Sequence, residues 1–172
     1  MNGDKTKIIR RYPVKASMLR SPAAFLALGF GSGLSPIMPG TCGTIAAIPI
    51  YILLHFLPAP LYFIAIALLF IVGIWICGVT AKKLKIHDHP AIVWDEIVGF
   101  LITMLLAPFN WLWILLGFIL FRVFDIFKPW PVRYADKHLT NGFGIMADDL
   151  LAAIYALVIL QIIISLCRMF CG

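Results

Sequence analysis

The chain has 172 residues, of which 62% are hydrophobic and only 13% are charged. Soluble domains are usually about 45–50% apolar, so this composition excludes an ordinary soluble globular protein. It predicts one integral membrane domain of the all-α class, a polytopic helical membrane protein.

Residues 1–21 are expected to form a basic amphipathic arm on the cytoplasmic surface of the membrane, where they would lie against anionic lipid. No cleavable signal peptide is expected, because the arm has no apolar core before Arg20 and no small-residue cleavage site follows in the usual place. Residues 22–172 are expected to form a single helical membrane domain.

Three apolar runs predict helices within this domain. Residues 61–79 contain no charged residue, and at about 1.5 Å per residue their helix nearly spans a hydrocarbon core of about 30 Å. The other two runs are 44–57, with 23–30 as an alternative backward extension, and 150–166.

The stretch 97–121 is either one kinked span or a hairpin, because "APFN" at 107–110 divides it into two short pieces. Charge placement decides between them, since Lys and Arg concentrate in cytoplasmic segments. Thirteen of the fourteen basic residues fall into three blocks: Lys5, Lys7, Arg10, Arg11, Lys15 and Arg20; Lys82, Lys83 and Lys85; and Arg122, Lys128, Arg133 and Lys137. A hairpin places all three blocks on the cytoplasmic side, so we predict the hairpin.

In this topology the acidic residues after Asp4 all lie at the cytoplasmic face. They are Asp88, Asp95, Glu96, Asp125, Asp136, Asp148 and Asp149. Acidic residues near helix N-termini commonly cap free amides and complement the helix dipole. The adjacent pairs Asp95–Glu96 and Asp148–Asp149 exceed what capping needs, and a bound cation would relieve their repulsion. Oxygen-only ligation suits Mg²⁺, so capping and a magnesium site both remain open.

Arg122, Asp125 and Lys128 are spaced three residues apart, which on a helix favours intrahelical ion pairs. The alternative is that Asp125 joins the metal site while the nearby cations Arg122, Lys128 and Arg133 hold phosphate.

The histidines and cysteines give weaker signals. His87 and His89 flank Asp88 and could bind a metal or move protons, but we favour a solvated loop because no second histidine cluster completes a zinc site. No function is assigned to the cysteines, which form no CxxC pair: Cys42, Cys77, Cys167 and Cys171.

The glycine-rich stretch "GFGSGLSPIMPGTCGT", at 29–44, predicts a turn or re-entrant loop. It contains neither GK[ST] nor GxGxxG, and helix packing by small residues is the alternative use of its glycines. "NGFG", at 141–144, predicts a second turn before Asp148.

Four stretches in this order carry a family resemblance: "GFGSGLSPIMPGTCGT", "HDHPAIVWDEIVG", "FRVFDIFKPWPVR" and "GFGIMADD". On these motifs the chain resembles the phosphatidylglycerophosphatase A family of bacterial membrane phosphatases, over about residues 22–160. The resemblance implies a mostly helical fold and Mg²⁺-dependent hydrolysis of the phosphomonoester of phosphatidylglycerophosphate to phosphatidylglycerol and phosphate, in phospholipid biosynthesis. Asn141 stands where the pattern has a glycine, and Asn tolerates the left-handed backbone of such a turn.

For this chemistry we expect one or two Mg²⁺ ions on the metal set Glu96, Asp125, Asp148 and Asp149. Asp95 is expected to be a further ligand or the general base. Arg122 and Lys128 are expected to stabilise charge on the phosphate. The expected phosphate contacts are Gly40, Thr41, Arg122, Lys128 and Arg133. Direct attack by metal-activated water is expected, because the motifs of covalent phosphatases are absent from the sequence.

The expected partners are the lipid substrate and membrane lipid, with no nucleic acid and no obligatory protein partner, at the bacterial inner membrane with the site facing the cytoplasm. Two other functions fit the sequence less well. A proton-coupled transporter would need carboxylates at mid-membrane depth, and the apolar runs contain none. A lipid-binding protein could use the basic arm alone, but it leaves the acid pairs without a purpose.

Overall fold

The computed structural model describes residues 14–86, 89–130, 132 and 141–171, and in these residues it contains helices and no strand. Two short 3-10 helices, η1 (Ala16–Arg20) and η2 (Gly29–Leu34), flank α2 (Pro22–Ala27). The longer helices are α3 (Pro39–His55), α4 (Ala59–Leu84), α5 (Trp94–Thr103), α6 (Trp111–Phe127) and α8 (Gly142–Cys171). The expected all-α fold is therefore confirmed.

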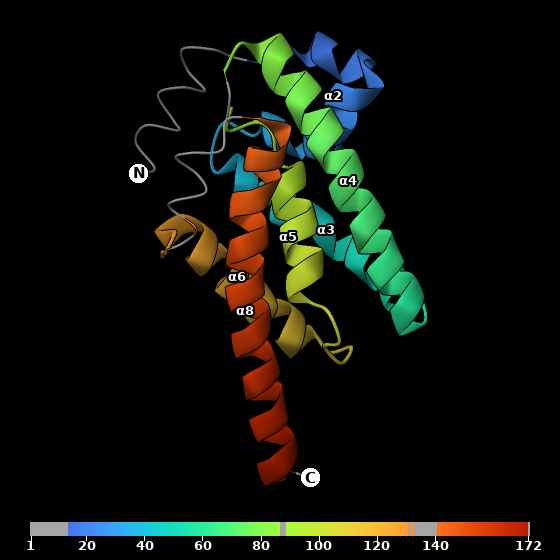
Figure 1. Cartoon of the computed structure of the whole chain (residues 1–172), viewed down its shortest axis with the longest axis vertical. Coiled ribbons are helices and arrows are strands. Elements are labelled where there is room, and N and C mark those ends of the chain that lie inside the picture. The colour runs from blue at the N-terminus through green and yellow to red at the C-terminus, as the bar shows by residue number, and fades with distance from the viewer. Residues whose placement is uncertain (1–13, 87–88, 131, 133–140, 172) are drawn as a thin grey trace.

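Helix α5 forms the centre of the bundle, and all ten of its residues are buried. It packs against α3, α4, α6 and α8, and Figure 1 shows it between α8 and α4. A helix that is apolar all round is expected to be enclosed, because each of its faces needs an apolar neighbour. The two acidic residues in its first turn, Asp95 and Glu96, are consequently carried into the interior.

The segment 97–121 is a helical hairpin in its chain path, as predicted. Helix α5 ends at Thr103, and α6 begins after Asn110, whose side-chain oxygen caps the new helix by accepting a hydrogen bond from the Leu112 N–H at 2.8 Å. Glu96, early in α5, and Arg122, late in α6, both border Gly40. The end of α6 therefore lies close to the beginning of α5.

Three predicted boundaries differ from the observed ones. Residues 23–30 do not extend α3 backwards, because Met38 adopts left-handed backbone (φ 54°) just before Pro39 and separates the two segments. The glycine-rich stretch is irregular only up to that point, and residues 39–44 are the first part of α3. Helix α8 begins at Gly142 and not after the paired aspartates.

The early start of α8 has a local cause. The side-chain oxygen of Asn141 accepts a hydrogen bond from the Gly144 N–H at 2.9 Å, which caps the helix. Asp148 and Asp149 therefore lie in the second turn of a helix that is long and apolar enough to cross a membrane. The predicted run 150–166 contains no carboxylate, but the observed helix starts earlier and so includes Asp148 and Asp149, whose side chains are buried in the bundle.

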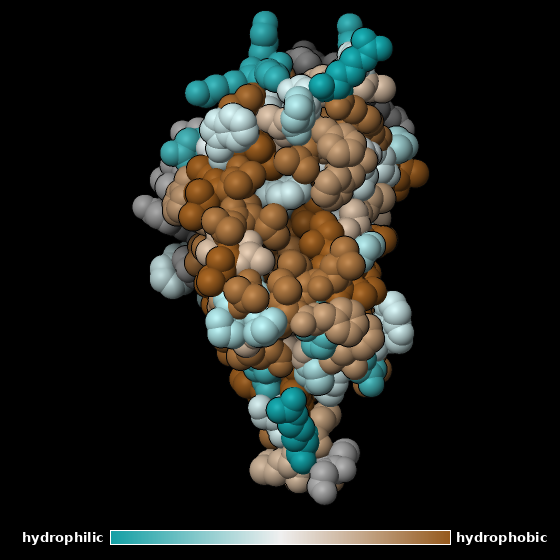
Figure 2. Space-filling view, turned by 90° about the vertical axis from the view of Figure 1, so that its right-hand side faces the viewer, coloured by the Kyte–Doolittle hydropathy of each residue, from teal (hydrophilic) through white to brown (hydrophobic). Residues whose placement is uncertain are grey.

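Helices α4 and α8 are both long and apolar enough to span a membrane. The outward face of α4 exposes large apolar side chains, among them Leu68, Ile71 and Trp75. Figure 2 views the molecule from the α4 side and shows a broad hydrophobic surface, with hydrophilic side chains gathered at the end where α4 terminates. Exposed apolar surface of this kind marks an interaction with lipid or with another protein.

The arm expected over 1–21 is described only from residue 14 onward. Helix η1 lies in this part, and the half-buried Met18 and Leu19 pack against a small cluster formed by Ala24, Leu28 and Ala91. The end of the arm is thereby attached to the bundle.

Candidate active site

Three buried carboxylates converge between α5 and α8. Asp95, Glu96 and Asp149 each offer an oxygen atom, and these atoms all lie within 4.8 Å of one another. The side chains are at most 7% exposed. Asp125 and Asp148 also lie close enough to interact with the charge of Asp149. The five acidic residues that the sequence analysis assigned to the site therefore lie in one region.

This arrangement is electrostatically costly unless a cation joins it. One oxygen of Asp95 (Oδ1) and one of Asp149 (Oδ2) are buried without a hydrogen-bond partner in the described part of the chain. Burial raises the pKa of the Asp95 carboxyl well above its usual range, and the charges of Glu96 and Asp149 raise it further. Several carboxylate oxygens within ligand distance of a common point suit a hard cation such as Mg²⁺. The residues present thus fit the expected metal.

Capping does not explain the Asp148–Asp149 pair, because Asn141 caps α8 and the aspartates lie a turn further on. Adjacent helix residues point about 100° apart, so the pair faces two neighbours. Asp149 joins the carboxylates of α5, whereas Asp148 turns toward α6. In α5 the acids do lie in the first turn, where they also complement the helix dipole.

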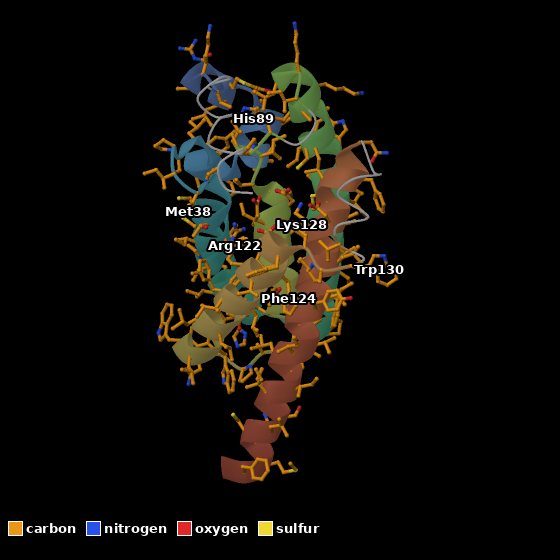
Figure 3. The ribbon with its side chains drawn as sticks, turned by 90° about the vertical axis from the view of Figure 1, so that its left-hand side faces the viewer. Met38, His89, Arg122, Phe124, Lys128 and Trp130 are labelled. Carbon is orange, nitrogen blue, oxygen red and sulfur yellow. The ribbon has the colours of Figure 1, made fainter. Side chains whose placement is uncertain are left out.

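Arg122 of α6 and Lys128, just after α6, are each paired with a carboxylate. Nη1 of Arg122 lies 2.6 Å from Oδ2 of Asp125, which is the ion pair that the i, i+3 spacing favoured. Lys128 does not continue this stripe, because α6 ends at Phe127 and Lys128 adopts left-handed backbone (φ 43°). Its buried ammonium instead lies 2.6 Å from Oδ2 of Asp148, linking α6 to α8. Figure 3 labels Arg122 and Lys128 on the last turns of α6 and just beyond them.

Gly40, at the start of α3, lies against both charged groups of the site. A Cβ atom built on Gly40 would overlap Oε1 of Glu96 and would lie 3.2 Å from both terminal nitrogens of Arg122. The N–H of Arg122 Nε is buried and has no acceptor among the described residues, so it is available to an anion. The absence of a side chain at residue 40 therefore lets the backbone approach a metal-ligand candidate and a phosphate-ligand candidate together.

The remaining predicted site residues have different outcomes. Thr41 is half-buried next to Gly40, and among the described residues its side chain forms no hydrogen bond with the carboxylates. Arg133 and His87 lie outside the described residues. The solvated-loop interpretation is wrong for His89, which is 1% exposed because its segment packs on the bundle, and its Nδ1 accepts a hydrogen bond from the Ala91 N–H. In Figure 3 His89 lies nearer the upper end of the molecule than Arg122.

Two residues near the site had no assigned role in the sequence analysis. Cys77 of α4 is buried and interacts electrostatically with Asp95. From the sequence, Asn141 is expected only to tolerate the backbone of a turn, yet its side chain caps the start of α8. A sequence reading could have identified Asn141, because Asn is a preferred N-cap residue. The spacing of Cys77 carries no comparable signal.

We expect Gly40→Ala to lower catalytic activity while the protein remains folded. The added methyl group meets the ends of two flexible side chains and not backbone, so Glu96 and Arg122 would move aside. A misplacement of about 1 Å at a reacting centre costs roughly a hundredfold in rate. Steady-state kinetics would measure the loss, with Cys42→Ala, two residues further along α3, as the control. Full activity of Gly40→Ala would remove residue 40 from the site.

Comparison with known proteins identifies relatives over most of the chain. A family model described as phosphatidylglycerophosphatase A matches residues 25–164. A phosphatidylglycerophosphatase A from Escherichia coli is 45% identical over 161 residues, covering 92% of this chain and 94% of the relative. One from Haemophilus influenzae is 48% identical over 149 residues, covering 86% and 91%.

A third relative, a putative phosphatidylinositol-3-phosphatase from Bacteroides thetaiotaomicron, is 39% identical over 148 residues, covering 80% of this chain and 90% of the relative. No solved structure is significantly similar to the chain. The matched region includes the three converging carboxylates, Gly40, Arg122 and Lys128.

Proposed function

The chain belongs to the phosphatidylglycerophosphatase A family and is a phosphatase, and from this premise we propose that it hydrolyses phosphatidylglycerophosphate to phosphatidylglycerol and inorganic phosphate by a Mg²⁺-dependent route. The observation that carries the proposal is the buried cluster of Asp95, Glu96 and Asp149 beside the guanidinium of Arg122. This arrangement offers oxygen ligands for a cation and a cationic donor for phosphate in one place.

We place the enzyme in the bacterial inner membrane, with several spans and with the site facing the cytoplasm. Two helices of spanning length and the exposed apolar face of α4 support a membrane location. The basic residues Lys82, Lys83 and Lys85 at the end of α4 support a cytoplasmic orientation of that end. A lipid phosphate at that surface would reach the carboxylates while its acyl chains stay in the bilayer.

Glu96 and Asp149 are the proposed Mg²⁺ ligands at the centre of the site, with Asp95 as a third ligand or as the general base. Asp125 and Asp148 lie beside them, each paired with a cation, and complete the proposed ligand set. When bound, Mg²⁺ would neutralise the phosphate and lower the pKa of the attacking water. Oδ1 of Asp95 and Oδ2 of Asp149 are buried and lack a hydrogen-bond partner in the described part of the chain, which supports this assignment.

The chain's own groups would then orient the phosphate and take up its charge. Arg122 can donate its free Nε–H, and the backbone at Gly40 can approach without a side chain in the way. Lys128, Thr41 and Arg133 complete the proposed phosphate contacts. Phosphoryl transfer depends chiefly on such positioning and charge stabilisation, with the attacking and leaving oxygens in line.

The proton-coupled transporter remains a rival with one observation in its favour, the position of Asp148 and Asp149 within a potential span. Membership of a phosphatase family decides against it. The experiment below separates the two functions directly.

The test is phosphate release from phosphatidylglycerophosphate by the purified protein in detergent micelles. We expect release with Mg²⁺, loss of release with EDTA, and recovery when Mg²⁺ is returned in excess. In parallel, Mg²⁺ without substrate should raise the melting temperature, because a ligand of the folded state at about 100 times its Kd adds about 2.7 kcal/mol of stability. Release unchanged by EDTA would exclude the metal, and no release with Mg²⁺ would exclude the proposed substrate.

A further inference from the structure

A pocket separate from the catalytic carboxylates lies between the last turns of α4 and the first turn of α8. Its volume is about 480 Å³. None of the carboxylates of the site lines it, and neither do Arg122 and Lys128. At this crossing the two helices approach closely, since a Cβ on Gly142 would overlap the carbonyl oxygen of Ile74.

The lining of the pocket is divided by chemistry. Its apolar part is formed by side chains one to three turns before the end of α4 and by the first turns of α8: Ile74, Trp75, Val79 and Ile145. Its charged part is formed by Lys82 and Lys85, which are both exposed. No carboxylate in the described part of the chain forms an ion pair with either lysine.

We propose that this pocket binds an anionic phospholipid of the surrounding bilayer at a site distinct from the active site. Lys82 and Lys85 would hold the headgroup phosphate, and the apolar part would receive the upper portion of an acyl chain. The proposal rests on the membrane location proposed above. Basic pockets between helices at the cytoplasmic side are suited to anionic headgroups, and Trp75 is of a type enriched at the membrane interface.

The geometry favours a lipid over a soluble anion. A free phosphate would occupy only the lysine end and would leave the apolar part of the pocket in contact with water. A zwitterionic lipid would fill both parts, but it brings no net charge to two adjacent cations. Only an anionic lipid complements the apolar and the basic lining together.

The test counts lipids bound to the full chain by native mass spectrometry in detergent, with phosphatidylglycerol and, separately, phosphatidylcholine. Three variants are compared with the wild type: Lys82→Gln/Lys85→Gln, Val79→Trp and Lys83→Gln. Lys83 is the matched control, because it is a neighbouring exposed lysine that donates a hydrogen bond to Ser21 and does not line the pocket. Circular dichroism and phosphatase activity establish that each variant is folded.

We expect the double lysine variant to bind one phosphatidylglycerol fewer. Its affinity for that lipid should fall about thirtyfold, because each lost contact between a lysine and the headgroup costs about fivefold in affinity. Val79→Trp keeps both lysines, fills the apolar part, and should lose the same lipid. Lys83→Gln should bind as the wild type does, and phosphatidylcholine should not occupy the site. Equal losses in Lys83→Gln, or unchanged binding by the double variant, would overturn the proposal, and either result leaves the phosphatase activity as a separate question.

Discussion

Asp149→Asn is expected to abolish Mg²⁺-dependent phosphate release without unfolding the protein. Asp149 is the residue of α8 that joins the carboxylates of α5, and one of its oxygens is buried with no hydrogen-bond partner among the residues that the structure describes. Removing a single preorganised electrostatic group from an active site typically costs about 10²–10³ in rate. We expect a loss of at least this size, measured as phosphate released per enzyme per minute.

Stability should move in the opposite direction from activity. In EDTA the wild type holds Asp149 close to Asp95 and Glu96, and replacing one carboxylate by an amide removes repulsion and adds a donor. The melting temperature of the variant in EDTA should therefore equal or exceed that of the wild type. The increase in melting temperature that Mg²⁺ causes in the wild type should be absent from the variant.

A matched control for charge alone is Asp4→Asn, near the start of the sequence, which should keep both the activity and the Mg²⁺-dependent rise in melting temperature. If Asp149→Asn melted well below the wild type in EDTA, Asp149 would be a structural residue and the metal assignment would fail. Retention of activity in Asp149→Asn would also contradict the assignment of Asp149 to the metal.

The sequence allowed the helical elements to be predicted where composition alone decides them. The uncharged run 61–79 lies within α4, and "APFN" marks the break between α5 and α6 because Asn110 caps the second helix. The start of α8 is earlier than the apolar run predicts, because the helix continues through two charged residues that usually mark the end of such a run. Asp148 and Asp149 are part of the helix, and their side chains meet buried groups of other segments, Lys128 and the carboxylates of α5. These contacts depend on how α5 and α6 pack against α8.

The sequence predicted which residue types form the site, but it did not predict every pairing between their side chains. Acid pairs beside apolar helices indicated that carboxylates meet, and Asp95, Glu96 and Asp149 do meet. Spacing correctly favoured the Arg122–Asp125 ion pair, which is local. The partner of Lys128 depends on where the chain leaves α6 and on the angle of α8, and neither is encoded in a spacing of three residues.

The ion pair between Lys128 and Asp148 should make a large contribution to stability that only a double-mutant cycle can reveal. Both side chains are buried, with 6% of the lysine and 10% of the aspartate side chain exposed. Breaking a buried pair by removing one partner typically costs about 3–5 kcal/mol, because the other charge stays buried without compensation. We therefore expect Lys128→Met and Asp148→Asn each to lower the free energy of unfolding by this amount, measured by denaturant titration in micelles.

The double variant Lys128→Met/Asp148→Asn removes both charges and should recover most of the loss, giving a cost well below the sum of the two single changes. Additive costs would show that the two charges do not interact. Activity should not recover with stability, because we assign Lys128 to the phosphate and Asp148 to the metal. A double variant that is both stable and active would show that neither charge is needed for the reaction.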